Sequence, residues 1–257
     1  MHLYEGQFGE RQDFSRVVQP SKILIIATTP RCGSHMLGHA LHETNSFGFP
    51  LEYAHPRNLA EWKRRLGVED FRLVLKEIQR RRTSSNGVFG IKIHYSHIKQ
   101  FGGFKKLLEY LPDAHYVLLS RGDVLRQAVS WSIASQTGVW ISGQKPVKDR
   151  PEYDFEHIAE RLRQTILQNA SWRYLLAANG CNYVEMNFCD VKSNLSQSIQ
   201  KIADFIDIEL DPGRIPETHL TKTQRGDINA EWAIKFISDF GTADGRWRNE
   251  DVRFPGL

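Results

Sequence analysis

The sequence predicts an α/β fold in which a central, mostly parallel sheet is flanked by helices. Four apolar segments have the length and composition of buried strands, and stretches with helical periodicity separate them along the chain. The four strand candidates are Lys22–Thr28, Val88–His94, 114–120 and 182–187. Alternation of buried strands with helices is typical of parallel sheets that are covered on both faces. A chain of 257 residues can form one sizeable core, so we expect a single domain over 1–257 with an irregular N-terminal extension over 1–20.

The first strand candidate leads into a short basic turn, Thr29-Pro-Arg-Cys-Gly-Ser-His-Met36, that opens a helix. Backbone N–H groups converge at a helix N-terminus, and the helix dipole there favours negative charge. Arg31 adds a fixed cation with forked donors. The turn therefore predicts a binding site for a phosphate or a sulfate.

The spacing of this turn differs from that of a Walker A loop. That loop has the pattern Gly-x-x-x-x-Gly-Lys-Ser/Thr, in which the lysine reaches the terminal phosphates and the hydroxyl holds Mg²⁺. This turn has one glycine, Gly33, and no lysine after it. A nucleotide or sugar kinase on a related fold stays an alternative, with the missing lysine against it, and we expect no metal.

The third strand candidate repeats the arrangement of strand, arginine, turn and helix. Arg121 follows it directly, and Asp123 is the expected N-cap of a helix over 124–136. Arg121 at the strand end and Ser130 on the helix can converge on a second phosphate, the arginine through a bidentate fork and the serine through its hydroxyl.

Three further helices are expected from periodicity and end signals. They run over 68–82 with a basic last turn that complements the helix dipole, from Phe155 after Asp154 to about 179 with Gly180 as its stop, and around Trp232.

Composition and charge limit the classes of protein and of partner. The net charge of +4 is modest and scattered, which fits a locally positive cleft for a polyanionic ligand and no nucleic-acid partner. The cysteines, Cys32, Cys181 and Cys189, form neither a disulfide framework nor a zinc site. No apolar run approaches the length of a membrane span, so we expect a cytoplasmic protein without a transmembrane segment.

Taken together, these motifs resemble those of the Stf0-type PAPS-dependent sulfotransferases. The matching pieces span most of the chain and are 30–34, 52–53, 87–92, 121–131, 136–140, 224–227 and 231–232. The resemblance implies a P-loop-like sulfotransferase fold that transfers a sulfuryl group from PAPS (3′-phosphoadenosine 5′-phosphosulfate) to a hydroxyl of a carbohydrate or glycolipid, with PAP as product. Cys32 and His35 stand where the group usually has Ser and Thr, which leaves a catalytically inactive PAPS- or PAP-binding protein as a second alternative. A homodimer is left open.

The resemblance also implies roles for individual residues in cofactor binding. Arg31 would stabilise the leaving group, and Arg121 with Ser130 would bind the 3′-phosphate. The 5′-phosphosulfate would lie on the backbone of Cys32, Gly33, Ser34, His35 and Met36, and a late polar loop with Lys222, Gln224 and Arg225 would close over the 3′-phosphate and adenine.

Glu52 matches the position of the proposed catalytic glutamate of the group. A carboxylate whose pKa partial burial raises toward neutrality can take a proton from a sugar hydroxyl. His55 and His94 are rival bases, because histidine titrates near neutrality. The match directs Lys92 toward the cofactor cleft rather than solvent. Three aromatic residues could be core or could stack on adenine or a sugar: Tyr53, Trp131 and Trp140. The segments 47–62 and 141–153 are expected to be the loops that select the acceptor.

Overall fold

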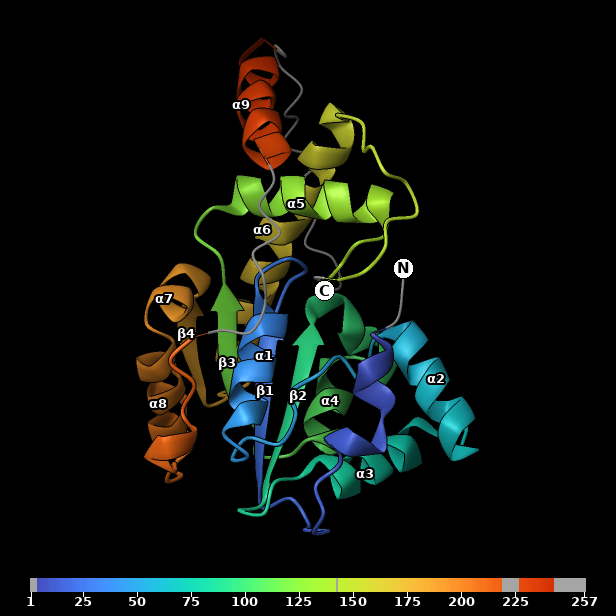
Figure 1. Cartoon of the computed structure of the whole chain (residues 1–257), viewed down its shortest axis with the longest axis vertical. Helices are drawn as coiled ribbons and strands as arrows, with labels where there is room; N and C mark the ends of the chain where they lie inside the picture. The colour runs from blue at the N-terminus through green and yellow to red at the C-terminus, as the bar shows by residue number, and fades with distance from the viewer. Residues whose placement is uncertain (1–3, 142, 219–226, 243–257) are drawn as a thin grey trace.

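A computed structural model describes residues 4–141, 143–218 and 227–242, and its centre is a parallel sheet (Figure 1). The strands are β1 Lys22–Thr28, β2 Val88–His94, β3 His115–Ser120 and β4 Tyr183–Asn187. Their order is β2-β1-β3-β4, and each neighbouring pair is parallel. The predicted α/β class and all four predicted strands are confirmed, with β3 and β4 each starting one residue later than expected.

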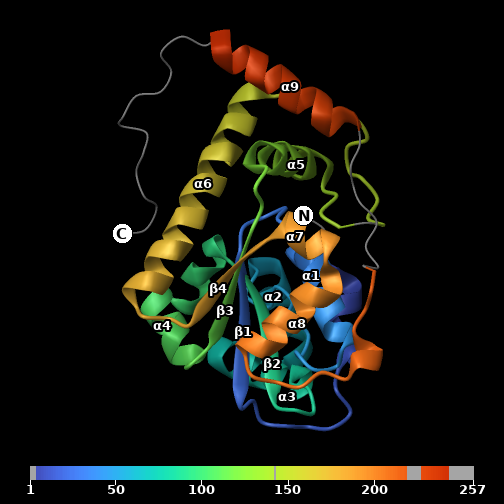
Figure 2. The same ribbon diagram turned by 90° about the vertical axis from the view of Figure 1, so that its left-hand side faces the viewer.

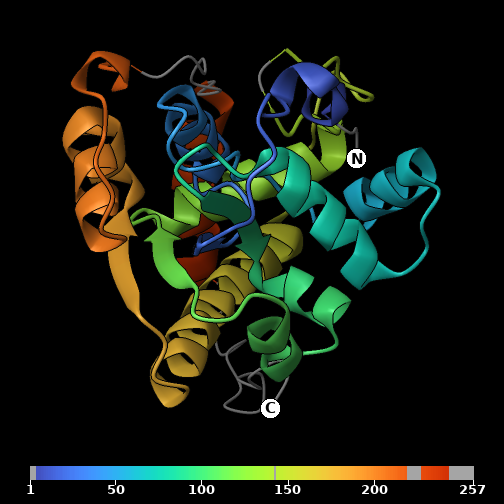
Figure 3. The ribbon, with the colours of Figure 1, turned by 90° about the horizontal axis from the view of Figure 1, so that it is seen from below.

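Helices cover both faces of this sheet, and short 3-10 turns occur before β1, after β2 and after α8. The helices are α1 Ser34–Glu43, α2 Pro56–Leu66, α3 Phe71–Arg82, α4 Phe104–Tyr110, α5 Val124–Thr137, α6 Phe155–Ala178, α7 Phe188–Ser193, α8 Leu195–Phe205 and α9 Asp227–Thr242. The 3-10 turns are η1 Glu5–Phe8, η2 Glu10–Gln12, η3 Tyr95–Phe101 and η4 Pro212–Arg214. Figure 2 shows α1, α7 and α8 on one side of the strands and α4 and α6 on the other. Seen from below, the orange α8 and the cyan α2 lie at opposite ends of the sheet (Figure 3).

Successive side chains of β1 enter opposite cores, because side chains alternate between the two faces of a strand. Leu24 and Ile26 pack with side chains of α1 and α8, whereas Ile25 and Ala27 pack with the core that contains Trp172 of α6. A separate cluster joins α5, α6 and α9 around Trp232. It lies beyond the carboxyl ends of the strands (Figure 1), and it confirms the C-terminal helix predicted around Trp232.

The N-terminal segment is fastened to α3 by Arg82, whose side chain is fully buried. Its Nε lies 2.8 Å from Oδ1 of Asp13, and its Nη2 donates to the carbonyl oxygens of Gln7 at 3.0 Å and Gly9 at 3.2 Å. The last arginine of the basic run therefore serves the fold, and it orders a segment that the sequence suggested was irregular.

Helix boundaries differ from the predictions where a local signal outweighed the periodicity. The helix predicted over 68–82 begins at Phe71, because the Asp70 side chain accepts the N–H of Leu73 as a cap. The second half of the predicted loop 47–62 is wrong, since α2 begins there with Pro56 at its first position, where proline is favoured. No helix of the described residues is long and apolar enough to cross a membrane.

Candidate active site

The candidate site lies at the carboxyl edge of the sheet, where ligands bind in open α/β folds. The register pairs Thr28 of β1 with His94 of β2, and Ala27 with Leu118 of β3. The segments that follow these strands therefore leave the sheet at one edge. They carry the predicted anion-binding turn, the residues after His94, and Arg121.

The turn between β1 and α1 has two residues in the left-handed region of the backbone map and leads directly into a helix. Arg31 and Gly33 both have positive φ, +64° and +85°. A Cβ at Gly33 would lie 2.0 Å from the ring of Phe188, so glycine is required there. Helix α1 begins directly after Gly33, which supplies no side-chain cap, and the first N–H groups of a helix have no partner within it. The cradle predicted on the backbone of 32–36 therefore has donors to offer.

Buried polar side chains hold this turn in place from behind. The Gln127 side chain donates to Oγ1 of Thr29 at 2.9 Å and to the carbonyl oxygen of Pro30 at 2.7 Å. Trp172 donates from Nε1 to the carbonyl oxygen of Thr28 at 3.0 Å. The sequence analysis assigned no role to Gln127, although its place three residues before Ser130 on one helix face was a usable signal.

Arg31 joins the two predicted phosphate motifs. Its Nε donates to Oγ of Ser130 at 3.0 Å, and its Nη1 donates to the carbonyl oxygen of Trp140. The sequence analysis placed Arg31 and Ser130 on different phosphates, and the structure brings them into contact. Burial, assisted by the positive charge of Arg121, lowers the pKa of Arg31 to about 10. Two guanidinium groups that repel each other in a buried place favour an anion between them.

The side chains of the cradle are mostly buried in the protein. Cys32 is fully buried, its thiol contacts the carbonyl oxygen of Leu119 at 3.2 Å, and burial raises its pKa to about 12. Ser34 and Met36 are also buried. The ring of His35 packs against His39 with centroids 4.4 Å apart, and burial lowers its pKa to about 2. These positions therefore offer an anion their backbone N–H groups and no side-chain charge.

Glu52 is brought to the same edge by a one-residue extension of the sheet. Leu51 forms a parallel bridge with Ile91, and its carbonyl oxygen accepts the N–H of Lys92 at 2.9 Å. Gly38 of α1 permits the approach, because a Cβ there would lie 2.4 Å from the carbonyl oxygen of Pro50. Glu52 follows directly on this bridge, beside the end of β2.

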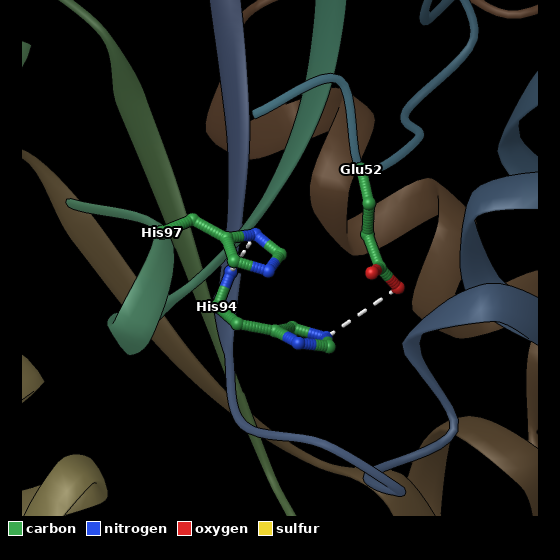
Figure 4. A group of neighbouring side chains, drawn as sticks. All are labelled: Glu52, His94 and His97. Atoms are coloured by element: carbon green, nitrogen blue, oxygen red, sulfur yellow. Dashed lines mark hydrogen bonds and ion pairs between the residues drawn. The ribbon is translucent and has the colours of Figure 1, made fainter. Parts of the chain in front are cut away.

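Glu52 forms a buried ion pair with Lys92. Its Oε1 lies 2.9 Å from Nζ of Lys92 and 3.6 Å from Nε2 of His94 (Figure 4 shows the His94 contact). The Lys92 side chain is 2% exposed and that of Glu52 is 25% exposed. Lys92 thus points at Glu52 rather than at solvent, and the carboxylate keeps some access to solvent.

The expectation of a raised pKa at Glu52 is wrong. Burial does raise it, but Lys92, then His94 and His97, together outweigh burial and hold the pKa of Glu52 well below its usual range. Glu52 is therefore ionised at neutral pH. Burial also lowers the pKa of His94 to about 4, that of His97 well below 6.5, and that of His55, so the rings beside Glu52 are neutral there. Ligand atoms of Glu52, His94 and His97 lie within 4.8 Å of one another, a spacing that a divalent ion could bridge.

The other predicted residues fall into three groups. Tyr53 belongs to the core, with no exposed surface and its hydroxyl donating to the carbonyl oxygen of Phe49 at 2.6 Å. Trp131 lies under Arg161, whose Cζ is 5.0 Å from the ring centre, and Trp140 contributes its carbonyl oxygen to Arg31. The late loop with Lys222, Gln224 and Arg225 lies outside the described residues.

A parallel sheet with a basic turn and a carboxylate at one edge defines an α/β protein with a candidate ligand site where its strands end. The family model of the Stf0 sulphotransferases matches residues 23–239, so the chain belongs to that family of sulfotransferases. A curated relative, trehalose 2-sulfotransferase of Mycobacterium tuberculosis (strain ATCC 35801 / TMC 107 / Erdman), is 24% identical over 88% of this chain and 97% of its own.

Solved sulfotransferase structures also match over most of the chain. The sulfotransferase domain from the curacin biosynthetic pathway is 10% identical, with a TM-score of 0.48, and the match covers 87% of this chain and 99% of that one. A sulfotransferase from Mycobacterium avium is 13% identical, with a TM-score of 0.45, over 90% of this chain and 78% of that one.

Proposed function

We propose that the protein transfers a sulfuryl group from PAPS to a hydroxyl of a carbohydrate or glycolipid, without a metal ion. One observation carries the proposal: the anion-binding turn after β1 and the ionised Glu52 lie at the same edge of the sheet. The family supports PAPS as donor. The name of the mycobacterial relative supports a sugar acceptor.

The residues divide the work of a loose, in-line displacement. The backbone of 32–36 would bind the 5′-phosphosulfate, and Arg31 would stabilise the charge that develops on the 5′-phosphate as its bond to sulfur breaks. Arg121 and Ser130 would bind the 3′-phosphate, and Gln224 with Arg225 would close over it. Their binding energy would align the sulfur atom with the acceptor.

Glu52 would be the general base. The acceptor oxygen forms its bond to sulfur as the bond from sulfur to the 5′-phosphate oxygen breaks, and the hydroxyl proton passes to the Glu52 carboxylate. A carboxylate with a low pKa is a weak base, but it is fully ionised at neutral pH, and the resemblance to the family supports a position beside the sugar hydroxyl. Binding of PAPS without turnover is the alternative that this low pKa favours.

Calorimetry with PAP and with ATP, each in EDTA and in Mg²⁺, tests the donor assignment. We expect PAP to bind equally in both media. A matched control is Lys148→Ala, which removes an exposed cation paired with Glu152 at 2.9 Å and should leave PAP affinity unchanged. ATP binding that requires Mg²⁺, with no heat from PAP, would instead identify a kinase.

We also propose a cytoplasmic location. The cysteines Cys32, Cys181 and Cys189 are free thiols, as a reducing compartment requires. Fractionation of the native cells tests this, and recovery of the protein in an extracytoplasmic fraction would contradict it.

A further inference from the structure

His94 and His97 cap each other across the end of β2. The His97 Nδ1 atom accepts the backbone N–H of His94 at 3.3 Å, and the His94 ring accepts the backbone N–H of His97 in return. Since Nε2 of His94 is the nitrogen that faces Glu52, the accepting nitrogen of His94 is Nδ1. Both rings therefore use Nδ1 as an acceptor.

This capping fixes the tautomer of both rings. A neutral imidazole has one nitrogen that accepts and one that carries hydrogen. With Nδ1 accepting in each ring, the hydrogen lies on Nε2. The rings stack with centroids 4.8 Å apart and an interplanar angle of 22°, and Figure 4 shows both extending toward the Glu52 carboxylate.

We infer that His94 and His97 are positioning residues for Glu52 and that neither is the base. The His94 N–H and the Lys92 ammonium both face Oε1 of Glu52. Both of these contacts are made by Oε1, so Oε2 is the oxygen we assign to the acceptor hydroxyl. His97 acts through His94, because its Nδ1 accepts the His94 backbone N–H and its ring stacks on the His94 ring. The role of Oε2 rests on the proposed function, whereas the tautomers do not.

The distance from His94 to Glu52 sets the size of the effect. At 3.6 Å the contact is longer than a hydrogen bond, and such contacts often shorten when a reactive complex forms. We therefore expect an effect at the lower end for a hydrogen bond to a charged group, about 10-fold in kcat.

The same tautomers disfavour a metal ion in this cluster. A metal would need the lone pairs of both Nε2 atoms, which here carry hydrogen, and the Nδ1 atoms would then have to donate toward backbone N–H groups. The Lys92 ammonium, 2.9 Å from Oε1 of Glu52, would also repel it. The cluster of Glu52, His94 and His97 is thus a carboxylate with hydrogen-bond donors around it.

Two substitutions at His94 separate a role in capping from a role toward Glu52. His94→Asn keeps an acceptor near the Nδ1 position and loses the N–H at Nε2. His94→Gln keeps an amide N–H near the Nε2 position and loses the cap. We expect His94→Asn to lower kcat about 10-fold with KM for PAPS unchanged and to move the acid limb of the pH profile to higher pH, because the pKa of Glu52 rises. His94→Gln should retain most of kcat and the wild-type limb.

The opposite order, with His94→Asn as active as wild type and His94→Gln impaired, overturns the positioning role and leaves sulfuryl transfer intact. Nitrogen-15 NMR of histidine-labelled, ligand-free protein at pH 7 supplies a readout that does not need turnover. Hydrogen on Nε2 of both rings, unchanged by one equivalent of Zn²⁺, is expected. Hydrogen on Nδ1 of either ring, or a Zn²⁺-dependent change at Nε2, overturns the inference. If the tautomers are as expected but the protein transfers no sulfuryl group to any acceptor, the proposed function is refuted, and with it the role of Oε2.

Discussion

Removing the carboxylate of Glu52 should destabilise the protein because it leaves the Lys92 charge buried. The Lys92 side chain is 2% exposed and its Nζ lies 2.9 Å from Oε1 of Glu52. Two charges about 4 Å apart attract by about 4 kcal/mol at an effective dielectric constant of about 20. Breaking a buried pair costs about 3 to 5 kcal/mol. Because the Glu52 side chain is 25% exposed, water screens part of this, and we expect Glu52→Gln to cost about 3 kcal/mol.

The reverse substitution should cost less. Lys92→Met leaves a carboxylate that water still reaches and that the His94 N–H still faces, so we expect a loss of about 1 kcal/mol. In the double variant neither charge is left unpaired. Its free energy of unfolding should therefore exceed that of Glu52→Gln alone, with a coupling of about 2 kcal/mol.

Urea unfolding followed by circular dichroism measures all corners of this cycle. A loss of about 3 kcal/mol corresponds to a fall in Tm of roughly 6 to 12 °C for a domain of this size. Strictly additive losses, or a Glu52→Gln variant within about 0.5 kcal/mol of wild type, would refute the reasoning. The cycle also sets the temperature at which the activity of Glu52→Gln can be compared fairly.

Three further outcomes are expected. Arg121→Ala should weaken PAP binding by about 2 kcal/mol, roughly 30-fold, and Ser130→Ala by less; equal PAP affinity in wild type and Arg121→Ala by calorimetry removes the 3′-phosphate assignment. Arg31→Ala should reduce turnover more than PAP affinity, because PAP lacks the departing sulfuryl group, and equal losses in both would contradict its role. Burial lowers the pKa of His39 and of His94 to about 4 in the folded protein, so the unfolded chain binds protons first as the pH falls below about 6.5. The free energy of unfolding that depends on these neutral histidines is therefore fully present above about pH 6.5 and is lost toward pH 4. A Tm that stays constant between pH 7 and about 4.5 would contradict this expectation.

The strands and the helix starts after Asp123 and Asp154 that the sequence indicated follow from local signals. The run Lys22–Thr28 is apolar between its first and last residues. Asp123 and Asp154 each stand just before a helical stretch, and each side chain accepts a backbone N–H of that helix. The start of α2 was missed because 47–62 combines buried aromatic residues with no clear period, and the Pro56 signal was passed over. Local patterns therefore predicted elements better than boundaries.

The sequence named residues of the candidate site but not the contacts between them. Arg31, Ser130, Glu52 and Lys92 were all named from the sequence, but their pairing depends on strand register and on a one-residue bridge at Leu51. Neither can be inferred from neighbours along the chain. The pKa shift of Glu52 was predicted in the wrong direction for the same reason. Burial can be inferred from the sequence, whereas the distance from Glu52 to Lys92 cannot.

Transfer of radioactive sulfur from labelled PAPS to a panel of sugars and glycolipids, trehalose among them, tests the central claim most directly. The assay is run in EDTA with wild type and Glu52→Gln at a temperature where both are folded. We expect a labelled sugar product from wild type and a kcat roughly 10²- to 10⁴-fold lower in Glu52→Gln, with PAP affinity little changed. Wild-type protein that labels no acceptor of the panel, or a Glu52→Gln variant with wild-type turnover, would contradict the account.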